Sequence, residues 1–224
     1  MFVWDLEGKR IFHAADSTLE GKTVNGTTDA LGRPYGKMFL ETASSTTGEG
    51  WVHYMFPEPE DIFPTWKSSY IKWVSFPNGE GYLVGSGIYN MKMDEFLIEE
   101  MVHQAAALIE EQGREAFDLL RDKKGRFFLM DTYVFVASPE GTEFVNPGQP
   151  SLEGKNLIDM KDLKGNFAVK EEIDLATEKG SGWMEMLWFK PGTNLPAPKM
   201  TYVKKAEFNG ETFIVGSGFY PEKE

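Results

Sequence analysis

The sequence contains no cysteine, so the chain can form no disulfide framework and has no thiolate for catalysis or metal binding. Its three histidines, His13, His53 and His103, lie far apart and show no spacing typical of a zinc site. No apolar run approaches the roughly 18 residues that a membrane span requires. The first residues do not read as a signal peptide. We therefore expect membrane attachment only through segments outside this chain.

Basic charge is also scarce. The chain has 23 Lys and Arg against 35 Asp and Glu, which gives a formal net charge of −12. Nucleic acids and anionic membranes are polyanions, so this balance argues against both as partners. At 224 residues the chain has room for one large domain or for two modules of about 100 residues each.

The strongest signal is an internal repeat. Three pairs of residues keep the same separation of 132 positions, namely Trp51 and Trp183, Lys67 and Lys199, and Tyr70 and Tyr202. Gly85-Ser86-Gly87 recurs as Gly216-Ser217-Gly218, and Leu19-Glu20-Gly21-Lys22 recurs as Leu152-Glu153-Gly154-Lys155. Matches in the same order and at nearly constant separation indicate two copies of one module.

The first copy predicts five strands, because its apolar and β-branched runs alternate with Gly- and Pro-containing turns. We expect these strands at residues 1–4, 10–14, 51–56, 67–76 and 82–89, with a short helix over 35–43. The prolines between residues 57 and 64 predict a long loop. The first copy therefore reads as an antiparallel sheet with a helical excursion after its second strand.

The second copy begins with a long helix. Asp94 is a suitable N-cap, an apolar stripe runs from Ile98 to Ile109 at helical spacing, and Gly113 is a suitable stop. Strands then follow at 127–136, 143–145, 183–189, 199–208 and 212–220, with a helix at 167–178. This organisation predicts a first module at 1–90, a connecting helix at 91–123 that belongs to the second module, and a second module at 124–224. The first module lacks such a helix, either because the helix precedes this chain or because the module forms without it.

These motifs resemble a Cache domain, and more narrowly the single-Cache type-2 group of bacterial chemoreceptors and sensor kinases. The resemblance is carried by Gly48-Glu49-Gly50-Trp51, Lys67-Ser68-Ser69-Tyr70-Ile71 and Gly85-Ser86-Gly87-Ile88-Tyr89. In the second copy it is carried by Gly180-Ser181-Gly182-Trp183, Pro198-Lys199-Met200-Thr201-Tyr202 and Gly216-Ser217-Gly218-Phe219-Tyr220. It covers nearly the whole chain.

The resemblance implies an α+β fold of two PAS-like (Cache) modules, each a curved antiparallel five-stranded sheet with helices on one face. It further implies a periplasmic or extracellular domain that senses a small molecule, often a short carboxylate, without catalysis and without a cofactor. The pocket would lie over the sheet, lined by aromatic residues and closed by the Pro-rich loop. The resemblance also allows a homodimer through the long helix.

A site for a small organic acid needs a fixed cation, hydrogen-bond donors and an apolar wall. We expect the lysines to supply the cation, the tryptophans the wall and the tyrosines the donors, which selects Trp51, Tyr54, Lys67, Tyr70, Trp183, Trp188, Lys199 and Tyr202. A lysine beside a strand commonly points into solvent, and a tryptophan after a glycine commonly fills a core. Both interpretations stay open on the residues alone.

The two copies differ at the position of Tyr54. Met186 stands in the second copy where Tyr54 stands in the first, so a hydroxyl donor is replaced by a flexible thioether. We therefore expect the first pocket to be better suited to a carboxylate, with Trp188 offering an indole N–H in the second.

Two other classes of function remain open. An enzyme on a PAS-like scaffold would need titratable groups that converge in a pocket, but no catalytic motif is apparent. An interaction or dimerisation module would have its interior filled by apolar side chains. The Gly-Ser-Gly elements lack the residues of a phosphate-binding loop, and they read better as points where the backbone is closely approached.

Overall fold

The structure is a computed structural model that describes residues 1–59, 61–193 and 195–221. The chain divides into two compact units. The first unit comprises Met1–Lys92 with Lys124–Arg126, and the second comprises Met93–Lys123 with Phe127–Glu224. Each unit contains one antiparallel five-stranded sheet, so the α+β fold class expected from the repeat is confirmed.

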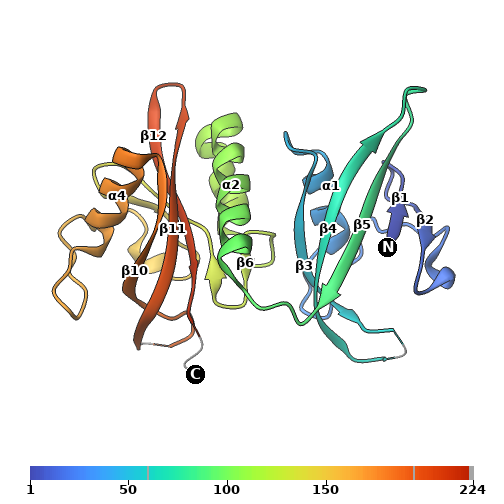
Figure 1. The fold of residues 1–224 in the computed structure, drawn as a ribbon, viewed down its shortest axis with the longest axis horizontal. Helices are drawn as coiled ribbons and strands as arrows, with labels where there is room; N and C mark the ends of the chain where they lie inside the picture. Colours follow the sequence, from blue (N-terminus) through green and yellow to red (C-terminus); the bar gives the residue numbers. More distant parts are fainter. Residues whose placement is uncertain (60, 194, 222–224) are drawn as a thin grey trace. The chain divides into compact units, whose positions relative to one another are not determined.

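The first unit contains β1 (Phe2–Trp4), β2 (Arg10–His13), a 3₁₀ turn at Ser17–Leu19, α1 (Tyr35–Ala43), β3 (Glu49–Pro57), β4 (Pro64–Ser75) and β5 (Gly81–Tyr89). Its sheet has the strand order β2-β1-β5-β4-β3. Helix α1 packs on one face of this sheet, where Tyr35, Met38 and Phe39 meet buried residues of the strands. All five predicted strands and the short helix are therefore present (Figure 1).

The second unit begins with α2 (Glu95–Gln112), a 3₁₀ turn at Gly113–Ala116 and α3 (Phe117–Arg121). It continues with β6 (Phe128–Leu129), β7 (Thr132–Tyr133), β8 (Phe135–Ala137), β9 (Glu143–Val145), a 3₁₀ turn at Pro150–Leu152, α4 (Ala168–Lys179), β10 (Ser181–Phe189), β11 (Pro196–Phe208) and β12 (Glu211–Phe219). The main sheet has the order β10-β11-β12-β8-β9. Strand for strand, this is the topology of the first sheet.

One expectation for the second unit is wrong. Residues 127–136 do not form a single strand, because the chain reverses between β6 and β7, which pair with each other outside the main sheet. Met130 lies in this reversal with φ at 52°, in the left-handed region. The reversal contains neither glycine nor proline, so the aromatic and β-branched composition of the segment concealed it.

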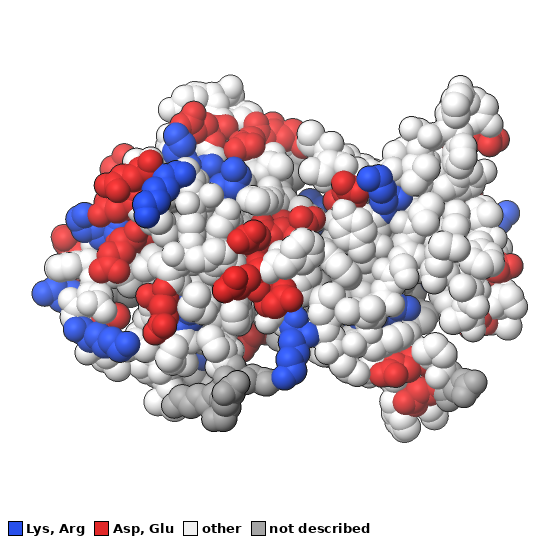
Figure 2. Space-filling model, in the orientation of Figure 1, with Lys and Arg blue, Asp and Glu red and all other residues white. Residues whose placement is uncertain are grey.

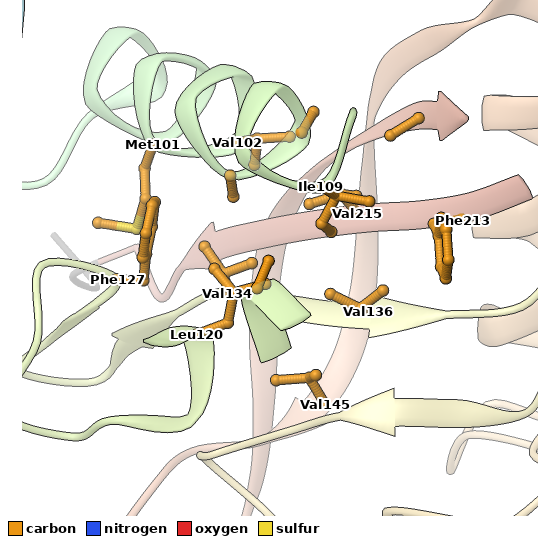
Figure 3. Packing of buried hydrophobic residues seen from close by; sticks show 14 of the residues in the cluster. Met101, Val102, Ile109, Leu120, Phe127, Val134, Val136, Val145, Phe213 and Val215 are labelled. Carbon is orange, nitrogen blue, oxygen red and sulfur yellow. The ribbon is translucent and has the colours of Figure 1, made fainter. Parts of the chain in front are cut away.

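The second sheet has a helix on each face. Helix α2 covers one face, and the resulting core includes Val102, Ile109, Phe213 and Val215 (Figure 3). Helix α4 covers the other face, where Ile173 packs with Val203 and Ile214 among others. Consecutive residues of one strand therefore belong to different cores, as the alternation of side chains in a strand requires.

The glycines of the repeated Gly-Ser-Gly element admit aromatic rings. A Cβ atom at Gly85 would overlap the ring of Phe2, and a Cβ atom at Gly216 would overlap the ring of Phe135. The two rings occupy equivalent places, since β1 pairs with β5 as β8 pairs with β12. Close approach to the backbone therefore accounts for the first glycine of each element.

The N-cap of α2 offers a test of this architecture. The side chain of Asp94 accepts a hydrogen bond from the backbone N–H of Leu97 at 3.0 Å. Asp94→Ala should lower the free energy of unfolding by about 1 kcal/mol, because the N–H loses its partner. Denaturant unfolding of the purified chain measures this loss. Asp94→Ser should retain most of the stability, and equal losses in both variants would contradict the capping role.

Candidate functional site

The strand register divides the predicted site residues between the two faces of each sheet. In the first unit Trp51 lies opposite Tyr70, and Tyr54 lies opposite Lys67. Trp51 and Tyr54 are three residues apart in β3, so their side chains point to opposite faces. Tyr54 belongs to the core under α1, which places Lys67 on that face as well. The expectation that Trp51 and Lys67 meet across one cavity is therefore wrong.

The second unit shows what the equivalent tryptophan and tyrosine do there. Trp183 pairs with Tyr202 across β10 and β11, and both pack against α2. The indole Nε1 of Trp183 donates to Glu99 Oε1 at 2.6 Å, and the Tyr202 hydroxyl lies 3.4 Å from His103 Nε2. These contacts hold helix α2 against the sheet, on the sheet face opposite the one that carries Lys199. Trp188, by contrast, lies on the same face as Lys199.

Lys67 is the central group of the first unit's candidate site. Its side chain is buried, with a residue exposure of 8%, and Nζ lies 4.9 Å from the ring centroids of both Phe56 and Tyr89. A Cβ atom at Gly87 would lie 3.1 Å from Lys67 Cε, so this glycine leaves room for the lysine stem. Lys199 has the same relation to Gly218, at 2.9 Å. The second glycine of each repeated element therefore leaves room for the repeated lysine and also for still closer atoms of the neighbouring strand, Ser69 Oγ at 2.3 Å from a Cβ at Gly87 and the Met200 carbonyl oxygen at 2.3 Å from one at Gly218.

Lys67 has no carboxylate partner among the described residues, since none of their carboxylate oxygens lies within 4.0 Å of Nζ. Burial alone lowers the pKa of the Lys67 ammonium below its ordinary value. The cation–π contacts with the two rings offset part of this desolvation. A buried ammonium without a counter-ion is a favourable position for an anionic ligand.

A pocket of about 510 Å³ opens beside this ammonium. That volume lies within the range that binds small molecules. The pocket is lined by residues of β1, β2, the first 3₁₀ turn, the Pro-rich loop and the strands that carry the lysine, namely Met1, Phe2, His13, Ala15, Asp16, Leu19, Phe56, Pro57, Glu58, Pro59, Asp61, Lys67, Gly87 and Tyr89. The Tyr89 hydroxyl donates to the carbonyl of Pro57 at 2.6 Å and so ties the Pro-rich loop to β5.

Two further basic residues lie near Lys67. The backbone N–H of Asp16 donates to His13 Nδ1 at 3.0 Å, so a neutral ring carries its proton on Nε2. Burial, then the charges of Lys67 and Arg10, lowers the pKa of His13, which favours that neutral form. Arg10 is itself buried and donates to the Tyr35 hydroxyl at 3.1 Å. Tyr54 lies behind this group, with its hydroxyl 3.1 Å from Ser69 Oγ.

The equivalent interior of the second unit is nearly closed. Lys199 is 1% exposed, and its Nζ lies 4.6 Å from the ring centroid of Tyr133. Beside it remain only about 10 Å³ for the centre of a water molecule, roughly the space that one water needs. The residues around this space are Phe135, Glu143, Asn146, Val169, Glu172, Met186, Trp188 and Lys199.

Two buried carboxyl groups distinguish this second interior. Burial raises the pKa of Glu143 to about 8, while Asn146 donates a hydrogen bond to its Oε1 at 2.7 Å. Burial likewise raises the pKa of Glu172 and lowers that of Lys199, and the attraction between the two groups opposes both shifts. Neither lysine has a carboxylate oxygen of the described residues within 4.0 Å, but Glu172 and Glu143 act to raise the pKa of Lys199, whereas no carboxyl group acts on that of Lys67.

The register shows that this contrast is a reversal of charge at one equivalent position. Arg10 pairs with Trp4 in the first sheet, and Glu143 pairs with Ala137 at the same place in the second. The two residues are 133 positions apart, the same separation as the Leu-Glu-Gly-Lys repeats. That separation would have identified Arg10 and Glu143 from the sequence. Glu172, on a helix longer than its counterpart, carries no comparable signal.

Neither a metal centre nor a membrane helix is found in the described part of the chain. No group of three or more His, Cys, Asp or Glu side chains there could hold a metal ion. None of the described helices has the length and apolar character needed to cross a membrane. Figure 2 shows Asp and Glu side chains spread over the visible surface among Lys and Arg, in keeping with the net charge of −12.

Two antiparallel five-stranded sheets share one topology, and each has helical cover and a lysine directed into its interior. This arrangement defines tandem modules of the PAS-like type. A model of the Cache domain matches residues 1–124 and again residues 98–224. The chain belongs to the Cache domain family, which confirms the resemblance seen in the sequence. It is a Cache sensor domain of the kind found in chemoreceptors and sensor kinases.

The relatives are bacterial signalling proteins. The chain is 32% identical over 90 residues to the sensor histidine kinase MctS of Rhizobium johnstonii, covering 40% of this chain and 19% of that protein. It is 28% identical over 90 residues to the methyl-accepting chemotaxis protein McpP of Pseudomonas putida, covering 40% and 16%. The matched part thus spans less than a fifth of these curated relatives.

A similar solved structure is described as the structural basis for carboxylic acid recognition by a Cache chemosensory domain. It is 25% identical to this chain, with a TM-score of 0.48, and the likeness covers 56% of this chain and 91% of that one.

The buried carboxyl group of Glu143 predicts a pH dependence of stability. Between the ordinary pKa of a glutamate, 4.5, and its folded pKa of about 8, Glu143 is ionised in the unfolded chain and protonated in the folded one. The folded state then binds more protons, so this contribution to stability is complete below 4.5 and is lost as the pH rises through about 8. Glu143→Gln should remove a loss of up to about 5 kcal/mol over this interval, the full value of a shift from 4.5 to about 8.

Denaturant unfolding of both proteins at several pH values measures this difference. Titrating groups far from Glu143 contribute equally to the two chains, so the difference reports Glu143 together with its electrostatic effect on Glu172 and Lys199. The glutamine can still accept the hydrogen bond from Asn146, which keeps the fold comparable. Parallel stability curves for the two proteins across this interval would contradict the prediction.

Proposed function

We propose that the first unit is the ligand-binding unit of a periplasmic or extracellular sensor, and that it binds a small organic acid through Lys67 without converting it. The observation that carries this proposal is a buried ammonium at the wall of a pocket of about 510 Å³, with no carboxylate of the described residues within 4.0 Å. A ligand carboxylate would supply the missing counter-ion, and the rings of Phe56 and Tyr89 would contact its hydrocarbon part.

His13 is the second polar group that we assign to the ligand. Its ring lines the pocket, and a neutral ring carries a proton on Nε2 because Nδ1 is already an acceptor. A neutral N–H donor and an ammonium together can hold both oxygens of one carboxylate. Tyr54 does not line the pocket, and we assign it a supporting role, because its ring packs against that of Tyr35 at a centroid distance of 5.0 Å.

We propose a different role for the second unit. Lys199 has Glu143 and Glu172 as neighbours, and the space beside it suffices for about one water molecule. We therefore assign Lys199 and Trp188 to the closed interior of that unit. The sheet faces opposite the two lysines carry the remaining candidates, namely Trp51, Tyr70, Trp183 and Tyr202. We assign these four residues to packing.

The expected homodimer through the long helix also remains a proposal. The apolar stripe of α2, which includes Ile98, Val102 and Ile109, is buried within its own unit. A dimer through this helix would therefore use its outward-facing residues, among which Phe96 is 61% exposed. Sedimentation of the purified chain over a range of concentrations tests for such a dimer.

The binding proposal predicts stabilisation by a short organic acid. At a ligand concentration one hundred times the dissociation constant, the folded state should gain about 2.7 kcal/mol. Thermal unfolding in a panel of acetate, propionate, butyrate and valerate measures the shift. Lys67→Met should abolish it, because the carboxylate loses its cation while the methionine preserves most of the packing.

Lys72→Met is the matched control. Lys72 lies on the same strand as Lys67 but on the opposite face, where it pairs with Glu49 at 2.7 Å. This variant should retain the full shift. An equal shift in the Lys67→Met protein would refute the assigned site, and nuclear magnetic resonance of the recovered acid would detect any chemical conversion.

A further inference from the structure

The pocket of the first unit has two poles of opposite charge. Its inner wall carries the Lys67 ammonium, while three carboxyl groups line other parts of the same pocket, from Asp16, Glu58 and Asp61. With His13 neutral, these side chains carry more negative than positive charge. A pocket of this kind does not favour a ligand that is negatively charged throughout.

Hydrogen bonds hold the acidic pole in place. Asp16 Oδ1 accepts from the backbone N–H and the hydroxyl of Thr18, at 2.9 and 2.6 Å, and these bonds lower the pKa of this carboxyl group. Asp61 Oδ1 accepts from the backbone N–H of Ile62 at 2.7 Å. Glu58 Oε1 accepts from the side-chain amide of Asn90 at 3.3 Å. The carboxylates are therefore fixed features of the pocket rim.

The two poles do not neutralise each other. None of the three carboxylates reaches within 4.0 Å of Lys67 Nζ. Burial is the sole cause that lowers the pKa of Lys67, and no carboxylate opposes it. A ligand that joins the poles must therefore carry its own two charges several bonds apart.

We infer, on the basis of the proposed function, that this pocket selects an ω-amino acid: its carboxylate meets Lys67, and an ammonium at the far end of an unbranched chain meets Asp16, Glu58 and Asp61. A dicarboxylate of the same length would place its second anion among these carboxylates. A simple fatty acid of that length would leave them without a partner and would gain only apolar contact.

Three ligands of equal chain length separate these cases. Valerate, glutarate and δ-aminovalerate share one carboxylate and differ at the far end, which is a methyl group, a second carboxylate or an aminomethyl group. Isothermal titration of the chain should rank δ-aminovalerate tightest and glutarate weakest. The margin over valerate should be roughly two- to fivefold for each carboxylate that contacts the ammonium, as for solvent-accessible ion pairs.

Glu58→Gln tests the acidic pole with little risk to the fold, since the glutamine oxygen can still accept from Asn90. This variant should weaken δ-aminovalerate roughly two- to fivefold, leave valerate unchanged and tighten glutarate. Glu80→Gln is the matched control, because Glu80 lies in the exposed turn between β4 and β5 of the same unit and does not line the pocket. It should change none of the three affinities.

Each outcome is decisive. If valerate binds as tightly as δ-aminovalerate and Glu58→Gln alters neither, the charge selection is refuted while the organic-acid site stands. The same holds if glutarate binds tightest. If none of the three ligands binds, or if all bind equally to the Lys67→Met protein, the proposed site itself fails and the inference fails with it.

Discussion

In each unit, a lysine side chain lies across a glycine of the neighbouring strand. Its ammonium group is buried on the sheet face that a helix covers. Gly87 admits the stem of Lys67, and Gly218 admits that of Lys199. A Cβ atom at Gly87 would meet Ser69 Oγ at 2.3 Å as well as the lysine stem, and one at Gly218 would meet the Met200 carbonyl oxygen at 2.3 Å as well as the stem of Lys199. The small residue on one strand and the long cationic residue on the next are therefore one structural unit, and the surroundings of each ammonium follow from it.

What surrounds the ammonium differs between the copies, although the strands, their order and their registers agree. The second unit supplies its own carboxyl groups from β9 and α4, whereas the first places Arg10 at the position of Glu143. A buried cation is stabilised by acidic groups beside it. The second copy has two carboxyl groups beside its lysine as part of its fold, and we propose that the first receives a carboxylate from a bound ligand.

Much of this arrangement can be predicted from the sequence, because residues that recur in both copies mark the same strand in each. The repeated Trp, Lys and Tyr predict β3 and β4 and their counterparts, and the repeated Gly-Ser-Gly element predicts β5 and β12. The spacing of three between Trp51 and Tyr54 already implies opposite faces. Which of them shares a face with Lys67 depends on the register, which the sequence does not display. The reversal at Met130 was hidden because a non-glycine residue adopts the left-handed conformation there. Glu172 was hidden because it is one acidic residue among several on α4.

The contacts of α2 with its sheet have a mechanical consequence. Glu99 and His103 lie one helical turn apart, and they meet Trp183 and Tyr202, which are paired across neighbouring strands. Two fastenings one turn apart resist both sliding of the helix along its axis and rotation about it. Helix α2 and its sheet should therefore move as one rigid body, so that a displacement at one end of the helix also displaces the sheet.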